Sequence, residues 1–420
     1  MSEKSEDQSF ARKLAAYAGS SMIFRIFRLG YAYVKPKFLE PAQLGIWNLL
    51  ALIPKYAGYM HLGCMNALVY RYPRLVSEGR IDEANAVRST VYRFSFYVQI
   101  FFAIGVTLFA SFGGFEGEMQ AGLYAVVLIV LLTWYYDMQL MTLKAEMRFD
   151  VITKANLIHS VALVIWGIPM VVLFKFYGVL ASAILTQLTV ITYLWRAHPL
   201  KERGAIDWGL LKSLIIEGFP VLVFSFGLVL MSTVDRFIIV GMLDVEALGF
   251  YAVALVAATF ILLIPVSLRD MIEPEMMAKL VKEKPEEIWR NYFLMPLLNT
   301  AAQFPFLMGA AAFLSKGVLE LVLPRYVASA EAAVFLCFGV YFMALVQVMR
   351  ATLVANGWGM WGLPFQAVGA GVNVVVSWVL VNQGWGITGV AAASGLSFAL
   401  VFLMLWGLIM RRGPYTGAEG

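Results

Sequence analysis

The sequence has few charged residues and very few of the residue types that form cross-links or metal sites. Only 14% of its 420 residues are charged, and it contains two cysteines and three histidines. A soluble domain carries roughly 25% charged residues, so this composition excludes an ordinary soluble globule. Both cysteines, Cys64 and Cys337, fall inside long apolar segments. We therefore interpret them as packing residues rather than as a disulfide or metal pair.

Two sequence motifs are also absent. The nucleotide-binding pattern G-x-x-x-x-G-K-[ST] does not occur, which argues against direct ATP hydrolysis. The opening segment MSEKSEDQSF has neither an apolar core nor a cleavage site. We expect residues 1–12 to be a cytoplasmic tail rather than a signal peptide.

What the chain does contain is a long series of apolar segments. Its residues are 61% hydrophobic, and its mean hydropathy is +0.76. A membrane-spanning helix needs about 20 mainly apolar residues, and a helix satisfies its own backbone groups in lipid. The sequence therefore predicts an all-α polytopic membrane protein with about twelve transmembrane helices. The predicted spans are 13–34, 44–66, 94–112, 123–143, 156–174, 179–195, 216–240, 248–268, 292–314, 332–353, 363–381 and 390–409.

Lysine and arginine collect in every second connection between these spans. The cation-rich connections include residues 69–93, 144–154, 196–212 and 269–290. Cationic loops stay on the cytoplasmic side, so we expect both termini to be cytoplasmic. The formal net charge of +5 then reflects topology rather than affinity for nucleic acid.

An internal repeat divides the chain. Residues 39–47 (LEPAQLGIW) and 243–251 (LDVEALGFY) share an acid, Leu-Gly and a large aromatic residue in the same order, and residues 177–179 (YGV) match 385–387 (WGI) at nearly the same offset. Two matches in register favour two six-helix lobes of the same orientation over a chance coincidence of short strings. The predicted organisation is a lobe at 13–200, a cytoplasmic linker at 201–215, a lobe at 216–410 and a tail at 411–420.

Three cations lie within the predicted spans of the first lobe. Arg25 and Arg28 are three residues apart and therefore share a helix face. Lys55 follows Pro54, which should kink the second span. An ionisable residue at the bilayer centre costs roughly 2.5–3.5 kcal/mol on insertion scales, so such residues are candidate functional groups. Guanidinium groups bind diphosphates through paired hydrogen bonds and lysine adds a point charge, so we interpret the three as a diphosphate-binding site.

Acidic residues keep an alternative open. Asp137, Glu217 and Asp235 lie toward the ends of their spans, and the cations could pair with them and only hold helices together. Arg236 directly follows Asp235, which favours local pairing or gating. Asp137 follows three aromatic residues, an arrangement that suits either a sugar ring or an interfacial aromatic belt.

Three longer segments carry a resemblance to a known family. They read FLEPAQLGIWNLL from residue 38, HLGCMNALVYRYPRL from residue 61 and STVDRFIIVGMLDVEALGFYAVA from residue 232. The chain resembles the polysaccharide transporter or Wzx-like O-antigen flippase family, whose superfamily also holds MATE antiporters and lipid II flippases. The resemblance implies a two-lobe bundle that flips an undecaprenyl-diphosphate-linked oligosaccharide, an O-antigen, capsule or exopolysaccharide unit, from the inner to the outer leaflet by alternating access. It also implies a monomer surrounded by membrane lipid, with a glycan polymerase complex as a candidate partner.

Two other functions compete with this interpretation. A MATE-like antiporter for small molecules or cations would need buried carboxylates, whereas the charges near the predicted midplane are basic. A membrane enzyme would need a long external loop with catalytic groups, and the longest external connection, 315–330, is too short. We therefore expect no enzymatic activity and no cofactor, with transport coupled to H⁺, Na⁺ or the membrane potential. His61 and His159 are weaker candidates for proton relays.

Overall fold

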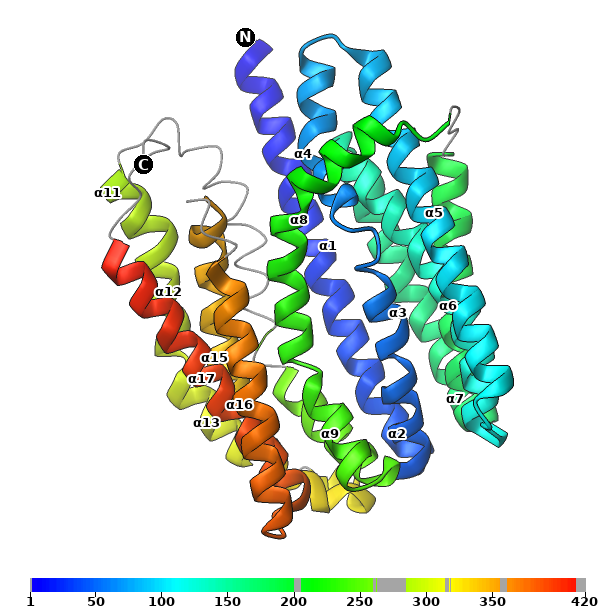
Figure 1. Ribbon diagram of the computed structural model, residues 1–420, viewed down its shortest axis with the longest axis vertical. Coiled ribbons are helices and arrows are strands. Elements are labelled where there is room, and N and C mark those ends of the chain that lie inside the picture. Colours follow the sequence, from blue (N-terminus) through cyan, green and yellow to red (C-terminus); the bar gives the residue numbers. More distant parts are fainter. Residues whose placement is uncertain are drawn as a thin grey trace. The chain divides into compact units, whose positions relative to one another are not determined.

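The computed structural model describes residues 2–199, 205–259, 262, 285–313, 317, 319–355 and 361–412. Helices make up almost all of this part of the chain, and no strand occurs in it (Figure 1). The chain forms two compact units, one of Met1–Phe38 with Ile46–Leu222 and the other of Leu39–Gly45 with Val223–Gly420. The expectation of an all-α membrane protein is confirmed, and seven helices of the described residues are long and apolar enough to cross a membrane.

The first unit is a bundle in which α1 and α6 both pack along α7. Its helices are α1 (Ser2–Phe38), most of α2 (Pro41–Leu50), α3 (Leu52–Ala57), α4 (Cys64–Ser77), α5 (Ile81–Phe112), α6 (Gly117–Ala145), α7 (Phe149–Ala197) and the first part of α8 (Trp208–Met231). Residues 2–12, expected as a tail, belong to α1 because no glycine or proline interrupts the helix there.

The element α7 is a hairpin of two helices rather than one straight rod. Lys175 has φ 48° and ψ −119°, outside the helical region. The indole Nε1 of Trp166 donates a hydrogen bond to Thr189 Oγ1 at 3.1 Å, although 23 residues of straight helix would span about 35 Å. The chain therefore reverses at Lys175, which agrees with the predicted break between the fifth and sixth spans.

The second predicted span is interrupted twice. The helix breaks at Ala51 between α2 and α3, one turn before Pro54, whose missing N–H cannot bond to the carbonyl four residues earlier. The chain then leaves the helix between α3 and α4, where Leu62 has φ 52° and Gly63 has φ 94°. A Cβ on Gly63 would lie 2.5 Å from the Gly218 carbonyl carbon, so the backbone passes directly against α8.

The second unit packs its helices around α15 and α17. Its main apolar core includes Phe224, Phe293, Val346 and Val401, each at most 1% exposed. Its described helices are the rest of α8, α9 (Val234–Met242), Val245–Thr259, α11 (Pro285–Ile288), η1 (Trp289–Leu294), α12 (Met295–Ala302), α13 (Phe304–Phe313), α14 (Leu319–Val322), η3 (Pro324–Ser329), α15 (Ala330–Ala355), α16 (Gly362–Asn382) and α17 (Gly386–Arg412).

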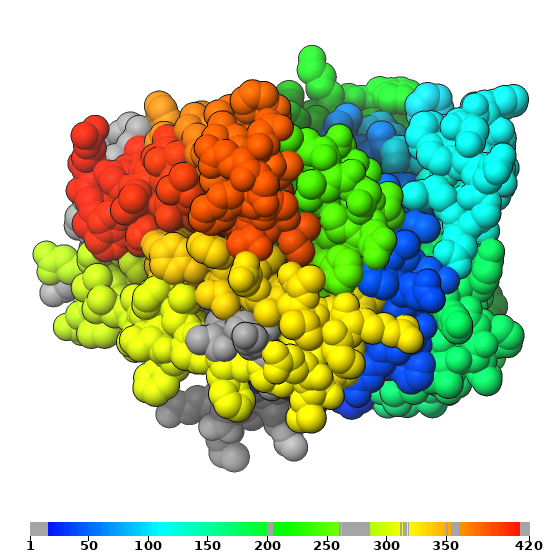
Figure 2. All heavy atoms as spheres, turned by 90° about the horizontal axis from the view of Figure 1, so that it is seen from below, coloured from blue at the N-terminus to red at the C-terminus, as the bar shows by residue number. Residues whose placement is uncertain are grey.

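The two copies of the Leu-Gly repeat meet inside the second unit. A Cβ on Gly45 would overlap the carbonyl oxygen of Val245, and a Cβ on Gly249 would overlap that of Pro41. The contact is reciprocal, because Pro41 and Gly45 stand at the same places in one copy as Val245 and Gly249 in the other. Tyr326 of η3 donates a hydrogen bond to the Leu39 carbonyl at 3.0 Å. Figure 2 shows the yellow segment that contains η3 beside a blue segment.

The boundary between the two units falls inside α8, at Leu222, because the first half of α8 packs on α4. Residues 201–204 of the predicted linker 201–215 lie outside the described residues. Much of the cation-rich connection 269–290 lies outside the described residues.

Candidate transport site

A stripe of three cations runs along one face of α1. Arg25, Arg28 and Lys35 share this face, because each residue of a helix adds about 100° and steps of three and seven residues nearly complete whole turns. The charges of Arg25 and Arg28 act on each other, as do those of Arg28 and Lys35. The first two were predicted as site residues, whereas Lys35 had been placed in an external connection because α1 was expected to end earlier.

Aromatic rings, rather than acids, contact two of these cations. The Arg28 guanidinium lies 5.6 Å from the centroid of the Phe24 ring. The Lys35 ammonium lies 5.4 Å from the Tyr31 ring and 5.3 Å from the Trp47 ring. Neither Arg28 nor Lys35 forms an ion pair with any acid of the described chain. The acids of the described chain therefore do not neutralise the charges of Arg28 and Lys35.

The third predicted cation, Lys55, lies in α3 of the same unit and its side chain is exposed. It follows the break at Ala51 and precedes the non-helical segment before α4. The structure thus brings Arg25, Arg28 and Lys55 into one unit, on two separate helices.

The predicted acidic residues have three different environments. Glu217 forms a surface pair with Arg71 at 3.6 Å, with side chains 44% and 32% exposed. Such exposed pairs are worth at most about 1 kcal/mol. Asp137 lies on α6 and lines a cavity of about 160 Å³. Asp235 is 3% exposed in the second unit.

Asp235 has its oxygens satisfied by neighbours. Its Oδ2 accepts a hydrogen bond from Tyr251 at 2.6 Å, and its Oδ1 accepts one from the Arg236 backbone N–H at 2.8 Å. The Arg236 side chain is half-buried, and its Nε has no partner among the described residues. A second polar chain joins α16 to α17, in which Ser377 Oγ donates to Asn373 Oδ1 and Asn373 Nδ2 donates to Ser394 Oγ, both at 3.0 Å.

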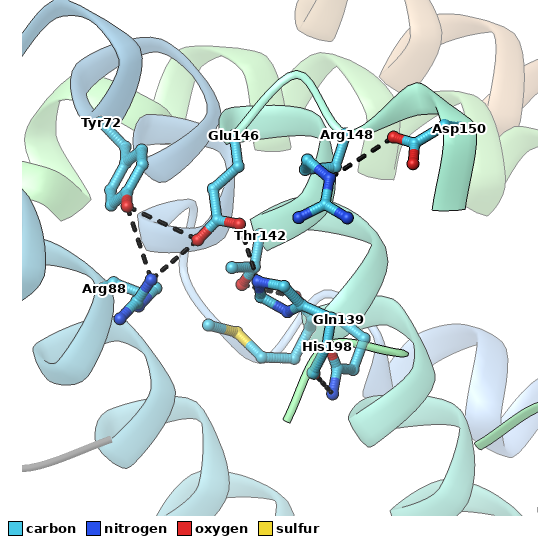
Figure 3. Close-up of polar contacts among 9 residues, drawn as sticks. Tyr72, Arg88, Gln139, Thr142, Glu146, Arg148, Asp150 and His198 are labelled. Atoms are coloured by element: carbon cyan, nitrogen blue, oxygen red, sulfur yellow. Dashed lines mark hydrogen bonds and ion pairs between the residues drawn. The ribbon is translucent and has the colours of Figure 1, made fainter. Parts of the chain in front are cut away.

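A partly buried ionic cluster at one end of the first unit was not predicted from the sequence (Figure 3). Glu146, which follows α6, accepts a hydrogen bond from Arg88 of α5 at 2.7 Å and lies 2.7 Å from His198 Nε2 after α7. Burial raises the pKa of Glu146, but His198 and Arg88 outweigh it and hold that pKa below its usual value. Tyr72 of α4 also contacts this carboxylate at 3.5 Å. The cluster therefore links α4 and α5 to the segments that follow α6 and α7.

Comparison with solved structures defines the class of protein. A multidrug resistance MATE family transporter of the MOP superfamily, in an inward-facing conformation, matches with a TM-score of 0.73 and 12% identity over 92% of this chain and 94% of that chain. The MATE transporter ClbM in complex with Rb⁺ matches at 0.60 and 15% over 95% and 94%. A mutant of the Vibrio cholerae MATE transporter VcmN matches at 0.65 and 12% over 96% and 97%. The fold is therefore that of the MATE transporters.

The family follows from a sequence model. The model described as "Polysaccharide biosynthesis protein" matches residues 37–331, well over half of the chain. The protein belongs to this family of polysaccharide biosynthesis proteins and has a MOP-superfamily transporter fold. Comparison with curated proteins finds no significant match.

Proposed function

We propose that this protein flips a polyprenyl-diphosphate-linked oligosaccharide from the inner to the outer leaflet of a bacterial inner membrane by alternating access. The membership of a polysaccharide biosynthesis family and the transporter fold support transport of a glycan precursor. In this proposal both termini are cytoplasmic, the protein acts as a monomer and carries out no covalent chemistry, and the gradient that drives it is H⁺, Na⁺ or the membrane potential. The transported O-antigen, capsule or exopolysaccharide unit is then passed to a glycan polymerase.

The cationic stripe on α1 is the observation that carries this proposal. A lipid-linked diphosphate carries several negative charges and many acceptor oxygens, which arginine binds through paired hydrogen bonds. Arg28 and Lys35 contact rings and no acid of the described residues, so their charge is not consumed by internal pairing. Lys55 would add a third point charge from α3.

A MATE-like antiporter for small cations is an alternative that is compatible with the fold. Cationic drugs would be held by buried carboxylates, and Asp137 and Asp235 are acids inside the two units. The two functions therefore differ in which charges they require. Flipping depends on the cations of α1, whereas cation export depends on the acids.

Flipping of a fluorescent lipid-linked oligosaccharide in proteoliposomes tests the proposal. We expect Arg25→Ala, Arg28→Ala and Lys55→Ala each to reduce flipping at least tenfold, because a lost charged hydrogen bond is worth about 1.5–3 kcal/mol. Lys35→Ala should act in the same direction. Arg28→Lys separates charge from geometry, since lysine keeps the charge but not the paired hydrogen bonds.

Lys37→Ala is the matched control, because Lys37 is an exposed cation of the same helix and lies about 180° around it from Arg28. It should flip lipid at the wild-type rate. Normal flipping by all of the stripe variants, with export of organic cations lost in Asp137→Asn or Asp235→Asn, would replace the flippase proposal with the antiporter.

A further inference from the structure

A mainly apolar cavity that contains a few polar groups lies in the first unit, between α6, α5 and the interrupted second span. It measures about 160 Å³ and is lined by Asp137, Trp134, Gln99, His61 and Met65, among others. Five α6 residues, Val130, Thr133, Trp134, Asp137 and Met141, face it because their spacing follows the helical repeat. The volume is enough for several water molecules, each of which occupies about 30 Å³ in the liquid.

The cavity forms where the helix is broken. Pro54, Ala57 and Gly58 line it at the end of α3, and His61 lines it from the non-helical segment before α4. Interrupted helices in transporters commonly mark binding sites, because unwound backbone is tolerated at membrane depth only beside protein or a hydrated cavity.

The wall carries polar atoms that have no hydrogen-bond partner in the described part of the chain. Trp134 is 7% exposed and Gln99 is 3% exposed, yet Trp134 Nε1 and Gln99 Oε1 have no hydrogen-bond partner among the described residues. Gln99 Nε2 donates to the Ala57 carbonyl at 2.6 Å, which fixes Oε1 as the remaining acceptor. Asp137 makes neither a hydrogen bond nor an ion pair within the same part of the chain. Unsatisfied buried groups of this kind call for a ligand or for water.

The mixture of donors and acceptors selects the ligand. His61 Nδ1 accepts a hydrogen bond from the Gly63 N–H at 3.0 Å, so a neutral His61 carries its proton on Nε2. The wall thus offers two donors, Trp134 and His61, and two acceptors, Gln99 and Asp137. It also includes the hydroxyl of Thr133, which can both donate and accept. A dehydrated metal cation needs a shell of oxygen ligands and is repelled by N–H donors. Water and a carboxyl group that exchanges a proton with it can use both kinds of partner.

We propose that this cavity is a proton-binding site in which Asp137 takes up a proton from water and later returns it to water. The proposal deepens the proposed function by naming the coupled ion. Its consequence for transport rests on that function, whereas proton binding to Asp137 does not depend on it. Asp137 differs in this respect from Asp235, whose two oxygens are already occupied by Tyr251 and the Arg236 backbone.

Few other charges act on this site. Among the described residues that line the cavity, Asp137 is the sole acid, and His61 from the broken segment is the other titratable group. Lys144 and Tyr136, both on α6, act on Asp137 from outside the cavity. Helix α5 contributes the uncharged Gln99, and α4 contributes Met65.

Infrared difference spectroscopy between two pH values, on the purified full chain in nanodiscs, tests proton binding directly. We expect a carbonyl-stretch band of a protonated carboxyl group that is lost in Asp137→Asn and shifted but present in Asp137→Glu. Asp150→Asn is the matched control, because Asp150 is an exposed acid, 47% accessible and paired with Arg148 at 3.4 Å. This control should keep the band. Asparagine has the shape of the neutral acid, so we expect a folded variant, which its melting curve verifies.

Four results would decide between these possibilities. A wild-type spectrum without the band, or a band that Asp137→Asn retains, overturns the proton site. Stabilisation of the wild type by NaCl over choline chloride, absent in Asp137→Asn, overturns it in favour of sodium. In proteoliposomes, loss of the response of flipping to a pH gradient in Asp137→Asn alone supports coupling. An Asp137-dependent band in a protein that flips no lipid-linked glycan would refute the proposed function and leave the proton site standing.

Discussion

The reciprocal contact of Gly45 and Gly249 predicts how much stability the protein loses when either glycine is replaced by alanine. At Gly45 and Gly249 an added Cβ would overlap a carbonyl oxygen of the other repeat copy, and the Cβ on Gly45 would also lie 3.1 Å from the Gly249 nitrogen. The obstacle is backbone on both sides, so no side chain can rotate away. Forced overpacking of this kind costs about 1–3 kcal/mol. Gly45→Ala and Gly249→Ala should therefore each destabilise the second unit.

Gly371→Ala provides the matched control. Gly371 lies inside α16, where an added Cβ would meet nothing within 4 Å. Alanine there should stabilise the protein by about 0.4–1 kcal/mol, because it restricts the unfolded chain. The free energy of unfolding of Gly45→Ala and of Gly249→Ala should thus lie below that of the control by roughly 1.5–4 kcal/mol. The double variant should lose less than the sum of the singles, because helices already separated by one methyl group accommodate the next more easily.

Melting curves with a thiol-reactive dye measure this difference, since Cys64 and Cys337 are both free and buried and become reactive on unfolding. If Gly45→Ala and Gly249→Ala both melt at or above the temperature of Gly371→Ala, the two repeat copies do not touch through their backbones. Strict additivity in the double variant would likewise refute a shared crossing.

Three further predictions concern single contacts. Glu146→Gln leaves the Arg88 guanidinium, 19% exposed, without its acid and should cost about 1–3 kcal/mol of stability at neutral pH. Because the pKa of Glu146 is lowered in the folded protein, this contribution is present above the ordinary carboxyl pKa of about 4.3 and is lost as the pH falls through the folded value. The melting temperatures of variant and wild type should therefore converge in acid. Gly63→Ala places a side chain at φ 94° and should lower the yield of folded protein in size-exclusion chromatography. Tyr251→Phe removes the donor to Asp235 and should lower the melting temperature by an amount equivalent to about 1–3 kcal/mol.

The parts of the fold that were predictable depend on local pattern. Apolar length alone indicated the helices, and the break between spans five and six was expected where Lys175 reverses the chain. The shared face of Arg25 and Arg28 follows from their spacing. Lys35 could have been added by the same rule, because it stands seven residues after Arg28, but α1 was expected to end at residue 34 and extends to Phe38.

The parts that were missed depend on tertiary register. Arg88, Glu146 and His198 fall in three separate predicted connections, and nothing in their spacing indicates that they meet. The Leu-Gly repeat was visible as a motif, yet the reason for its glycines is a contact between residues about 200 positions apart. A sequence shows that such residues recur, whereas only the packed chain shows that they touch.

Fold and charge answer different questions about this protein. Its fold is shared with multidrug MATE transporters at 12% identity, and a shared fold does not determine what is carried. Side-chain chemistry separates the candidates, because an anionic lipid and a cationic drug require binding groups of opposite sign. Two cations of α1, Arg28 and Lys35, contact aromatic rings and pair with no acid of the described chain. The acid at Asp137 lies in a cavity suited to a proton and a few water molecules, which is too small for a drug-sized ligand since such pockets measure about 300–1,000 Å³. The two features are therefore consistent with one transporter, in which the cations hold the substrate and the acid exchanges the coupled proton.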